Sequence, residues 1–546
     1  MRPALRWDRD NPGGPPLRTN VMQKLMRWFR GPAALAALAG VAAAAVVLSV
    51  AELAGAFFTA RATPLVALGS TFIDFTPPWL KDFAIATFGT NDKAALFAGM
   101  GVTVFVLACV LGVMAYRRWA LGAAGVLFMG AVIVASVVTR AGVRPLDAVP
   151  SLAGTAAGLV VLRLLVSRLW RRQVFPDAPA DVAAKEPERP ATSRRAFFAA
   201  TGLTAAAAAI AATGGRLLSA ARSNVAQARE SLRLPAPARP AAAVPGGVQS
   251  ATAGVTPWLT PARDFYRIDT ALSVPEIRAE EWELRVHGLV EEEVRLTFQD
   301  LLGADLIESH VTLTCVSNPV GGNLAGNARW LGLPVREVLK RARPTAGADM
   351  VLSTSVDGFS ASTPLEVLQD DRDAMLAIGM NGEPLPLEHG YPVRMVVPGL
   401  YGFVSATKWV VELEVTRFAD SKAYWTERGW SERGPIKTMA RIEVPKSFAT
   451  VPAGRVAIGG TAWAQRRGIT RVEVQVDGGN WAEAALSDEA SVDTWRQWSY
   501  LWDAKPGQHY IRARATDGTG EVQTEKRADP VPDGASGWQS VMVTVE

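Results

Sequence analysis

Long apolar segments fill the first part of this chain and restrict it to folds that place them in a lipid bilayer. Five segments, near 33–58, 94–115, 119–139, 147–168 and 196–213, are long enough as helices to cross a hydrocarbon layer of about 30 Å. A helix satisfies its backbone hydrogen bonds internally, as the bilayer core requires. After residue 260 the composition changes to the mixed charges and aromatics of a soluble globule. We therefore expect an N-terminal α-helical transmembrane bundle followed by soluble domains.

The positive charge of the chain lies largely beside these apolar segments. Arginines and lysines precede the first segment, and four arginines fall within 163–172 at the end of the fourth. The positive-inside rule then places the N-terminus, the link at Arg117-Arg118 and the 163–172 end in the cytoplasm. The outer link at Arg140–Arg144 is a local exception. The location of these positive residues beside apolar segments is explained by membrane topology. We therefore take the net charge of +5 as no indication of nucleic-acid binding, and we expect none.

A fifth segment, 196–213, is less hydrophobic than the other four. The residues Ser193-Arg194-Arg195-Ala196-Phe197-Phe198 precede it. Paired arginines, an aromatic and a weak apolar core are typical of twin-arginine export signals. An ordinary arginine pair at a cytoplasmic helix end fits the same residues. We favour an export signal retained as a fifth helix, which would leave the following half of the chain outside the cytoplasm in a multi-pass cell-membrane protein.

The chain divides further at linkers and at changes of periodicity. In chain order we expect a cytoplasmic N-terminus, a four-helix transmembrane region, a Pro-rich linker, the fifth helix, an extended Ala/Pro-rich tether outside the membrane, and two soluble domains. Their bounds are 1–30, 31–172, 173–192, 193–218, 219–255, 256–440 and 441–546.

The two soluble domains differ in their pattern. Residues 256–440 mix strand-like runs at 282–286 and 391–397 with a helical stretch at Val335–Arg341, which predicts an α+β domain. In 441–546, apolar residues alternate in 471–476 and 509–516, and no helical period occurs. Several short strands over about a hundred residues favour an immunoglobulin-like β-sandwich.

Only two cysteines occur, Cys109 within an apolar segment and Cys315 in the soluble half. Cys315 ends the strand-like run 310–314, and a loop with Ser317-Asn318-Pro319 and Gly321-Gly322 follows. A thiolate at a strand end is a suitable soft metal ligand. A lone cysteine is, however, usually a buried structural residue. Chemistry alone leaves both interpretations open.

Three separated motifs resemble those of the sulfite oxidase family of molybdopterin oxidoreductases. Cys315 with Asn318, followed by Arg329-Trp330 and Gly332, is similar to the molybdenum-cysteine segment. The second motif is 389–399 (HGYPVRMVVPG), continued by Gly402 and Lys408-Trp409 and preceded by 381–386, and the third is Phe265-Tyr266-Arg267. With the immunoglobulin-like tail, the resemblance covers nearly all of 256–546.

The resemblance implies a molybdenum–molybdopterin cofactor with one pterin, for which Cys315 would be the metal ligand. Arg394 and Lys408 would hold the pterin phosphate, and His389 would hydrogen-bond the cofactor. The other implied cofactor-binding residues are Arg263, Tyr266, Arg267, Asp357 and Thr407. The implied catalytic residues are Cys315, Arg267 and Trp430.

Two departures from the family pattern put sulfite in doubt as the substrate. Sulfite-oxidising members carry an arginine shortly after the cysteine, whereas 316–322 holds no cation here. They also carry a tyrosine near the end of the domain, where this chain has Trp430.

The redox partner and the oligomeric state are further expectations. No histidine precedes His287, so we expect no haem in this chain and a separate electron-transfer partner. The family resemblance leaves open a homodimer through 441–546.

Three classes of function follow. The leading one is a membrane-anchored, extracytoplasmic oxidoreductase that performs two-electron oxygen-atom transfer on an unknown small substrate. The second is a non-catalytic exported scaffold with a vestigial pterin fold and an immunoglobulin-like interaction domain. The third is a transporter, which the few charges in the apolar segments, of which Glu52 is the clearest, do not favour.

Overall fold

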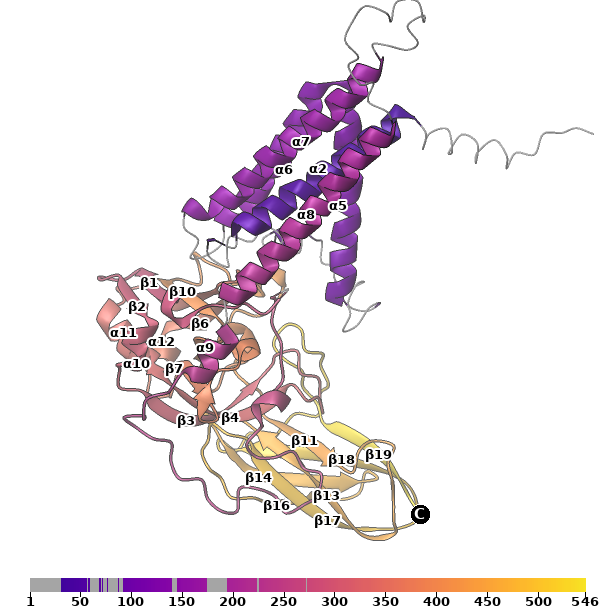
Figure 1. The fold of residues 1–546 in the computed structure, drawn as a ribbon. Coiled ribbons are helices and arrows are strands. Elements are labelled where there is room, and N and C mark those ends of the chain that lie inside the picture. The colour runs from indigo at the N-terminus through magenta and orange to yellow at the C-terminus, as the bar shows by residue number, and fades with distance from the viewer. Residues whose placement is uncertain are drawn as a thin grey trace, which may run out of the picture. The chain divides into compact units, whose positions relative to one another are not determined.

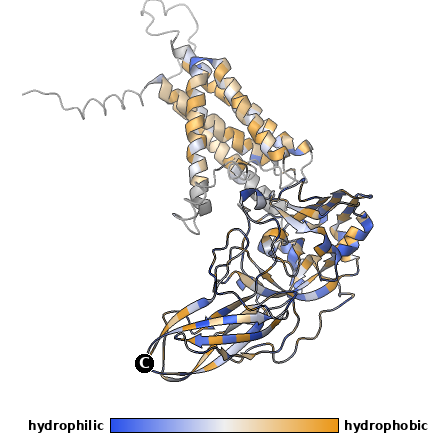
Figure 2. Ribbon diagram, turned by 180° about the vertical axis from the view of Figure 1, so that it is seen from behind, coloured by the Kyte–Doolittle hydropathy of each residue, from blue (hydrophilic) through white to orange (hydrophobic). Residues whose placement is uncertain are grey.

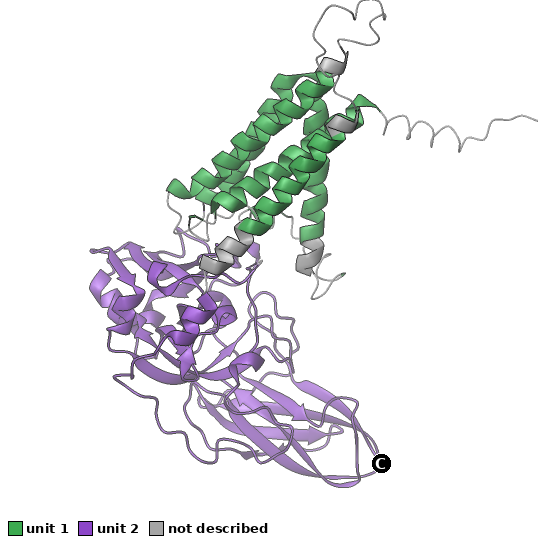
Figure 3. Ribbon diagram, in the orientation of Figure 1, with its two compact units in different colours: residues 1–138, 144–219 green, residues 139–143, 220–546 purple. Residues whose placement is uncertain are grey.

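The computed structural model describes residues 31–55, 92–139, 145–173, 194–222, 225–271 and 273–546, with a few isolated positions between 57 and 87. The predicted N-terminus 1–30 and nearly all of the predicted linker 173–192 lie outside these residues. The chain forms two compact units, Met1–Val138 with Arg144–Ser219 and Thr139–Val143 with Ala220–Glu546 (Figure 3). We describe each unit by itself.

The first unit consists of long helices (Figure 1). They are α2 (Pro32–Gly55), α5 (Asp92–Arg117), α6 (Trp119–Val138), α7 (Val149–Gln173) and α8 (Arg194–Arg222), and η3 (Pro145–Ala148) precedes α7. Four helices among the described residues are long and apolar enough to cross a membrane, at Pro32–Gly55, Phe97–Arg117, Trp119–Val138 and Leu146–Trp170 (Figure 2). They coincide with the first four predicted spans. The fifth predicted span falls on α8, whose apolar part is shorter, at Phe198–Gly214.

Glycines allow these helices to approach closely. A Cβ added to Gly40 of α2 would lie 2.0 Å from the Ala108 carbonyl oxygen of α5, and one on Gly112 would lie 2.2 Å from the Ala36 carbonyl oxygen. On α7, a Cβ on Gly158 would lie 2.2 Å from the side chain of Val47. Small residues at such crossings permit van der Waals packing where no hydrophobic effect drives helix association.

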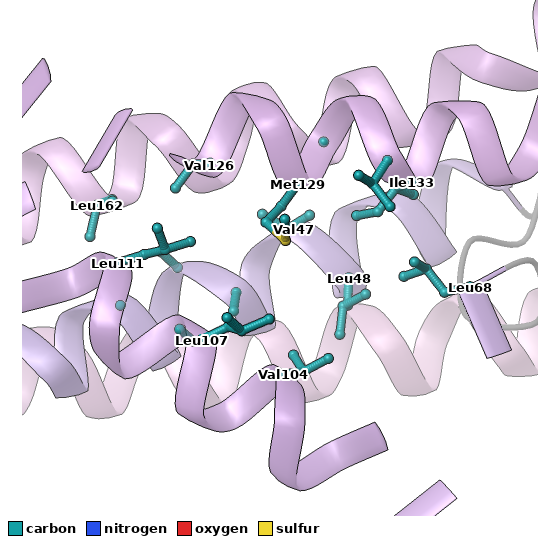
Figure 4. Close-up of a pocket in the computed structure, with 16 residues that line it drawn as sticks. Val47, Leu48, Leu68, Val104, Leu107, Leu111, Val126, Met129, Ile133 and Leu162 are labelled. Atoms are coloured by element: carbon teal, nitrogen blue, oxygen red, sulfur yellow. The ribbon is translucent and has the colours of Figure 1, made fainter. Parts of the chain in front are cut away.

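An apolar cavity of about 140 Å³ lies among α2, α5, α6 and α7 (Figure 4). Its lining includes Val47, Leu107, Leu111, Met129 and Ile133. All sixteen lining residues are glycine or apolar. The cavity therefore offers an ion or polar solute no ligand side chain.

The first part of the second unit has two sheets, β2-β1-β10-β5-β6 and β3-β4-β7-β8, and β9 pairs with β7. Their strands are β1 (Glu283–Gly288), β2 (Val294–Thr297), β3 (Ile307–Thr314), β4 (Ala325–Pro334), β5 (Met350–Ser355), β6 (Ser360–Pro364), β7 (Met375–Met380), β8 (Glu383–Pro384), β9 (Arg394–Val396) and β10 (Val410–Thr416). The helices are α9 (Val225–Ser231), α10 (Phe298–Leu302), α11 (Val335–Ala342) and α12 (Leu365–Gln369).

The predicted elements of this part are present, one of them shortened. β1 and α11 correspond to the expected strand 282–286 and helix 335–341. The expected strand 391–397 is reduced to β9, Arg394–Val396. Pro392 and Pro398 flank it, and proline has no N–H to donate to a strand ladder.

The last part of the second unit is entirely β-structure. It has two sheets, β11-β13-β17-β16 and β12-β19-β18-β14-β15. The strands are β11 (Met439–Val444), β12 (Thr450–Val451), β13 (Gly454–Trp463), β14 (Ile469–Val476), β15 (Ala482–Glu483), β16 (Ala485–Leu486), β17 (Arg496–Ala504), β18 (Gly507–Asp517) and β19 (Gln539–Val545). Both sheets contribute to one core that includes Ile458, Trp498, Val472, Ile511 and Val543. The alternation in the sequence therefore predicted a β-rich region correctly.

The segment 219–255 differs from the free tether that its composition predicts. Arg229 donates to the carbonyl oxygens of Pro384 and Leu385, each at 2.7 Å. Arg239 forms a parallel bridge with Ile307, and Ser250 N donates to Gln497 Oε1 at 2.5 Å. Backbone hydrogen bonds and single arginines hold this segment against the rest of the second unit. The hydropathy of the segment does not predict these contacts.

A buried ion pair connects the β-rich part to the loop that follows Cys315. Arg441 donates to Glu443, and both side chains are less than a tenth exposed. The same guanidinium donates from Nη1 to the Gly322 carbonyl oxygen at 3.0 Å. Gln465 donates to the Thr312 carbonyl oxygen at 2.9 Å, on β3. The β-rich part therefore holds the strand and the loop on both sides of the cysteine.

Replacing Glu443 by Gln should destabilise the second unit strongly. The change leaves the Arg441 guanidinium buried without a counter-charge, and breaking a buried pair in this way costs about 3–5 kcal/mol of unfolding free energy. Thermal unfolding of the purified chain measures the effect. Glu337→Gln, which breaks an exposed pair with Lys340, is the matched control and should change the midpoint little. Equal midpoints for the two variants would contradict the role of Glu443.

Candidate functional site

Cys315 lies where β3 ends and a tight loop begins. Its backbone N–H donates to the Leu324 carbonyl oxygen at 2.9 Å, and its carbonyl oxygen accepts from Asn318 N at 3.1 Å. The Asn318 side chain accepts from Leu324 N at 2.9 Å, which closes the loop on itself. Asn318, part of the first sequence motif, thus fixes the backbone that presents the sulfur.

The thiol of Cys315 is buried, with 8% of the residue exposed. Burial raises the pKa of this thiol, and a hydrogen bond with Ser317 and the positive charge of Lys408 oppose the rise. The Cys315 Sγ and Ser317 Oγ atoms are 2.9 Å apart. Metal binding requires the thiolate, so a bound metal would displace the proton that burial favours.

The second motif brings two cations together around Gly390. This glycine has φ +111°, a conformation that residues with a Cβ rarely adopt. A Cβ there would lie 3.0 Å from the Cβ of Arg394 and 3.2 Å from the Cβ of Lys408. Because Gly390 has no Cβ, Arg394 and Lys408 can both pack closely against it.

Arg394 is a buried guanidinium whose hydrogen bonds all go to neutral groups. It donates to the carbonyl oxygens of Met395, His389 and Ala406 at 3.3, 3.1 and 3.5 Å, and its guanidinium carbon lies 5.0 Å from the Trp330 ring centroid. Burial lowers its pKa to about 10. No carboxylate among the described residues pairs with it. Because a buried charge normally requires a counter-charge, this position suits an anion.

Lys408 shares one carboxylate with Arg267. Lys408 Nζ lies 3.1 Å from Asp269 Oδ2, and Arg267 Nε donates to the same oxygen at 2.9 Å. Lys408 Nζ also donates to the Glu388 carbonyl oxygen at 3.0 Å. Burial lowers the pKa of Lys408 to about 8, against the opposing effect of Asp269. With Arg394 nearby, this group holds three cations and one carboxylate, so it carries a net positive charge.

His389 presents a buried nitrogen that lacks a protein partner. Its Nε2 lies 2.8 Å from the Ala262 carbonyl oxygen, which fixes this nitrogen as the donor of a neutral ring. The Nδ1 atom is buried and has no hydrogen-bond partner among the described residues. Burial lowers the pKa of His389 to about 4, so the ring is neutral at pH 7 and Nδ1 is an acceptor. A cofactor N–H would satisfy it.

The third motif lines the same pocket. Phe265 meets the ring of His389 edge-on at 5.6 Å and stacks on Tyr266 at 5.2 Å. The Tyr266 hydroxyl lies 3.9 Å from the place that a Cβ on Gly402 would occupy, and the Thr314 carbonyl oxygen lies at the same distance. Burial raises the pKa of Tyr266, and the charge of Cys315 adds to the rise.

A second phenol, that of Tyr401, was missed by the sequence analysis. It is 3% exposed, and burial raises its pKa to about 12, with a further contribution from Cys315. Its hydroxyl accepts from Lys437 N at 3.4 Å. Tyr401 stands inside the second motif beside Gly402, and this position is the signal in the sequence that marks it.

Two of the implied site residues, Arg263 and Trp430, make their described contacts with residues outside the predicted set. The Arg263 side chain is 86% exposed and pairs with Asp264, so only its neighbour Ala262 contacts His389. Trp430 packs on Phe403 and Trp425 at 5.9 and 6.0 Å, and no described contact joins it to Cys315.

Two further implied residues form hydrogen bonds with neighbouring groups of the protein. Asp357 accepts from Thr270 Oγ1 at 2.9 Å and from Phe359 N at 3.2 Å. Thr407 is fully buried, and its hydroxyl hydrogen-bonds with Ser353 at 2.7 Å. In the chain, Asp357 follows the end of β5, and Thr407 precedes the start of β10.

The arrangement fits a phosphate-bearing pterin that carries a metal. Buried Arg394 and Lys408 suit the phosphate, and the orphaned Nδ1 of His389 suits a pterin N–H. Cys315 supplies the soft ligand. Among the described residues no three His, Cys, Asp or Glu side chains gather around one point.

Comparison with known proteins agrees with this chemistry. The family described as oxidoreductase molybdopterin binding domain matches residues 271–425, which include Cys315, His389, Arg394 and Lys408. These matches identify residues 271–425 as a molybdopterin-binding oxidoreductase domain of the sulfite oxidase type.

Three relatives illustrate the match. Mitochondrial sulfite oxidase of Mus musculus is 30% identical over 317 residues, 49% of this chain and 58% of that protein. Sulfite oxidase of Arabidopsis thaliana is 28% identical over 330 residues, 50% of this chain and 84% of that protein. Inducible nitrate reductase [NADH] 1 of Glycine max is 27% identical over 319 residues, 46% of this chain and 36% of that protein.

Among solved structures, sulfane dehydrogenase SoxCD from Paracoccus pantotrophus aligns with a TM-score of 0.47 at 25% identity, over 54% of this chain and 85% of that one. The chain spans little more than half the length of the mammalian relatives it matches, 58% for the mouse enzyme.

The anion site predicts a pH-dependent response to sulfate, whose charge is constant between pH 6 and 9. Bound sulfate should raise the unfolding temperature of the cofactor-free chain. The pKa of Lys408, about 8 in the empty site, means that the cation is lost as the pH rises through that value. A bound anion raises this pKa, so sulfate affinity is constant below about pH 8 and falls above it.

Arg394→Met is the control, because sulfate also stabilises proteins by exclusion from their surfaces. The variant should keep that general effect and lose the specific, pH-dependent part. The same sulfate response in both proteins at every pH would show that Arg394 and Lys408 form no anion site.

Proposed function

We propose that this chain is a membrane-anchored, extracytoplasmic molybdenum-cofactor oxidoreductase that acts on a small substrate by two-electron, oxygen-atom-transfer chemistry. The observation that carries the proposal is the convergence of a buried thiol with two buried cations. Cys315, Arg394 and Lys408 are all buried, and the positive charge of Lys408 acts on the Cys315 thiol. A vestigial scaffold would not be expected to retain such unfavourable burial.

Each residue then has a defined task. Cys315 binds molybdenum, which supplies two-electron redox chemistry when bound. Arg394 and Lys408 hold the phosphate, and His389 Nδ1 accepts a hydrogen bond from the pterin while Ala262 orients the ring. Asp269 keeps Arg267 and Lys408 in place. Tyr266 and Tyr401 are two phenols on which the charge of Cys315 acts, and both stay protonated at neutral pH because burial raises their pKa values.

The substrate and the electron partner follow from the surroundings of the thiol. The loop 316–322 brings no cation of its own, and Arg441, which reaches Gly322, is neutralised by Glu443. These features favour a substrate other than sulfite, either a sulfoxide-type compound that is reduced or a small oxyanion that is oxidised. A separate protein exchanges electrons with the site.

The topology completes the proposal. The four apolar helices cross the cell membrane with the N-terminus and the 163–172 end in the cytoplasm. Helix α8, with its twin-arginine-like start, carries the second unit to the outer side. Domain boundaries follow the seven parts expected from the sequence, with the segment 219–255 added to the catalytic unit. The β-rich part 441–546 is an immunoglobulin-like sandwich and offers a surface for a homodimer.

Cys315→Ser tests the metal ligand. The substitution should abolish turnover while leaving pterin and most of the molybdenum bound, because Arg394, Lys408 and His389 are unchanged. X-ray absorption at the molybdenum edge should report one sulfur ligand fewer than in the natural chain. Ser317→Ala is the neighbouring control and should keep the full sulfur count. An unchanged count in Cys315→Ser would exclude this cysteine as the ligand.

Replacing Arg194-Arg195 by Lys-Lys tests export. The four apolar helices should still insert, since their hydropathy is unchanged, while the second unit stays in the cytoplasm. Protease added to the outer face of intact cells measures the effect. It should digest the second unit of the natural chain and spare that of the variant. Digestion of both would exclude twin-arginine export.

A further inference from the structure

A cationic and aromatic cluster closes one end of the first unit. It consists of Arg117 and Arg118 between α5 and α6, Trp119 at the start of α6, and Arg163 and Trp170 on α7. The Arg163 guanidinium carbon lies 4.7 Å from the Trp119 ring centroid and 5.2 Å from the Trp170 ring centroid. Trp170 Nε1 donates to the Tyr116 carbonyl oxygen at 2.7 Å, which fixes this indole. We call these residues the Arg163 cluster.

Arg163 lies within the span Leu146–Trp170, at the end that the positive-inside rule places in the cytoplasm. It precedes Trp170 by about two helical turns, about 10 Å along the axis. An arginine near a span end is stable where it reaches the interface or meets a counter-charge. The two indoles contribute cation–π attraction to its guanidinium. They leave its positive charge uncompensated.

No carboxylate of the described residues lies in the cluster. The acidic residues of these helices are Glu52, Asp92 and Asp147, and all three stand at the opposite helix ends. The side chains of Arg117, Arg118, Arg163 and Arg168 are exposed. Several cations, aromatic rings of the membrane interface and an apolar surface below them match one ligand, a phospholipid with an anionic headgroup and two acyl chains.

We propose that the Arg163 cluster binds the phosphodiester of an anionic phospholipid, with Arg163 as the fixed contact. This inference rests on the membrane placement of the first unit proposed above. The Arg163 guanidinium lies near both indoles and is exposed, so a phosphate oxygen can accept from its N–H groups. The neighbouring arginines add attraction without a fixed geometry.

The test uses the full-length chain in detergent with equal amounts of phosphatidylglycerol and phosphatidylcholine. Native mass spectrometry of the retained lipid should show enrichment of phosphatidylglycerol. Arg163→Gln should reduce the enrichment about fivefold, the effect of one cation near an anionic surface. Arg163→Lys keeps the charge and loses the stacked plane, and it should lose most of the enrichment. Arg278→Gln, an exposed arginine of the second unit, is the control and should lose none.

Two results would overturn the inference. Full enrichment in Arg163→Lys would show that only charge matters and that the stacked guanidinium is not the contact. Displacement of phosphatidylglycerol by millimolar glycerol phosphate would indicate a site for a soluble anion. Retention of the chain by pure phosphatidylcholine vesicles after an alkaline wash reports membrane insertion separately. Loss of the chain in that wash would instead overturn the membrane placement.

Discussion

The burial of positive charge beside a single thiol is the constraint on which the rest of the second unit depends. Desolvation lowers the pKa values of Lys408 and Arg394, so the empty pocket is electrostatically unfavourable. The fold tolerates this because Gly390 provides the backbone conformation that brings both cations to one point and Asp269 compensates part of the charge. A bound phosphate would supply the negative charge that this group of cations lacks. The pocket is therefore built for a cofactor whose binding completes its charge balance.

The two parts of the second unit share the task of placing the sulfur. The first part supplies β3, whose end presents Cys315. The β-rich part holds the following loop through Arg441 and the strand through Gln465. Arg441 lies near the rings of Trp463 and Trp495 and pairs with Glu443. A C-terminal part that only mediated association would not need to contact the loop after Cys315.

Much of this organisation follows from local sequence. Span length and hydropathy predict the four apolar helices, alternation predicts the β-rich part, and the motifs around Cys315 and 389–399 single out the thiol and the cations. Contacts between distant residues left no such signal. The packing of 219–255, the exposure of Arg263 and the contact of Arg441 with Gly322 depend on tertiary structure. Tyr401 was missed because the family resemblance points to a tyrosine at position 430, near the end of the domain.

Molybdenum and pterin content of the full-length chain, purified in detergent from a host that makes the cofactor, tests the central claim most directly. The account predicts near-equal molar amounts of metal, pterin and protein, and loss of the pterin when Arg394 is replaced by Met, because that guanidinium has no other counter-charge among the described residues. Absence of both metal and pterin from the natural chain would contradict the account and favour a scaffold.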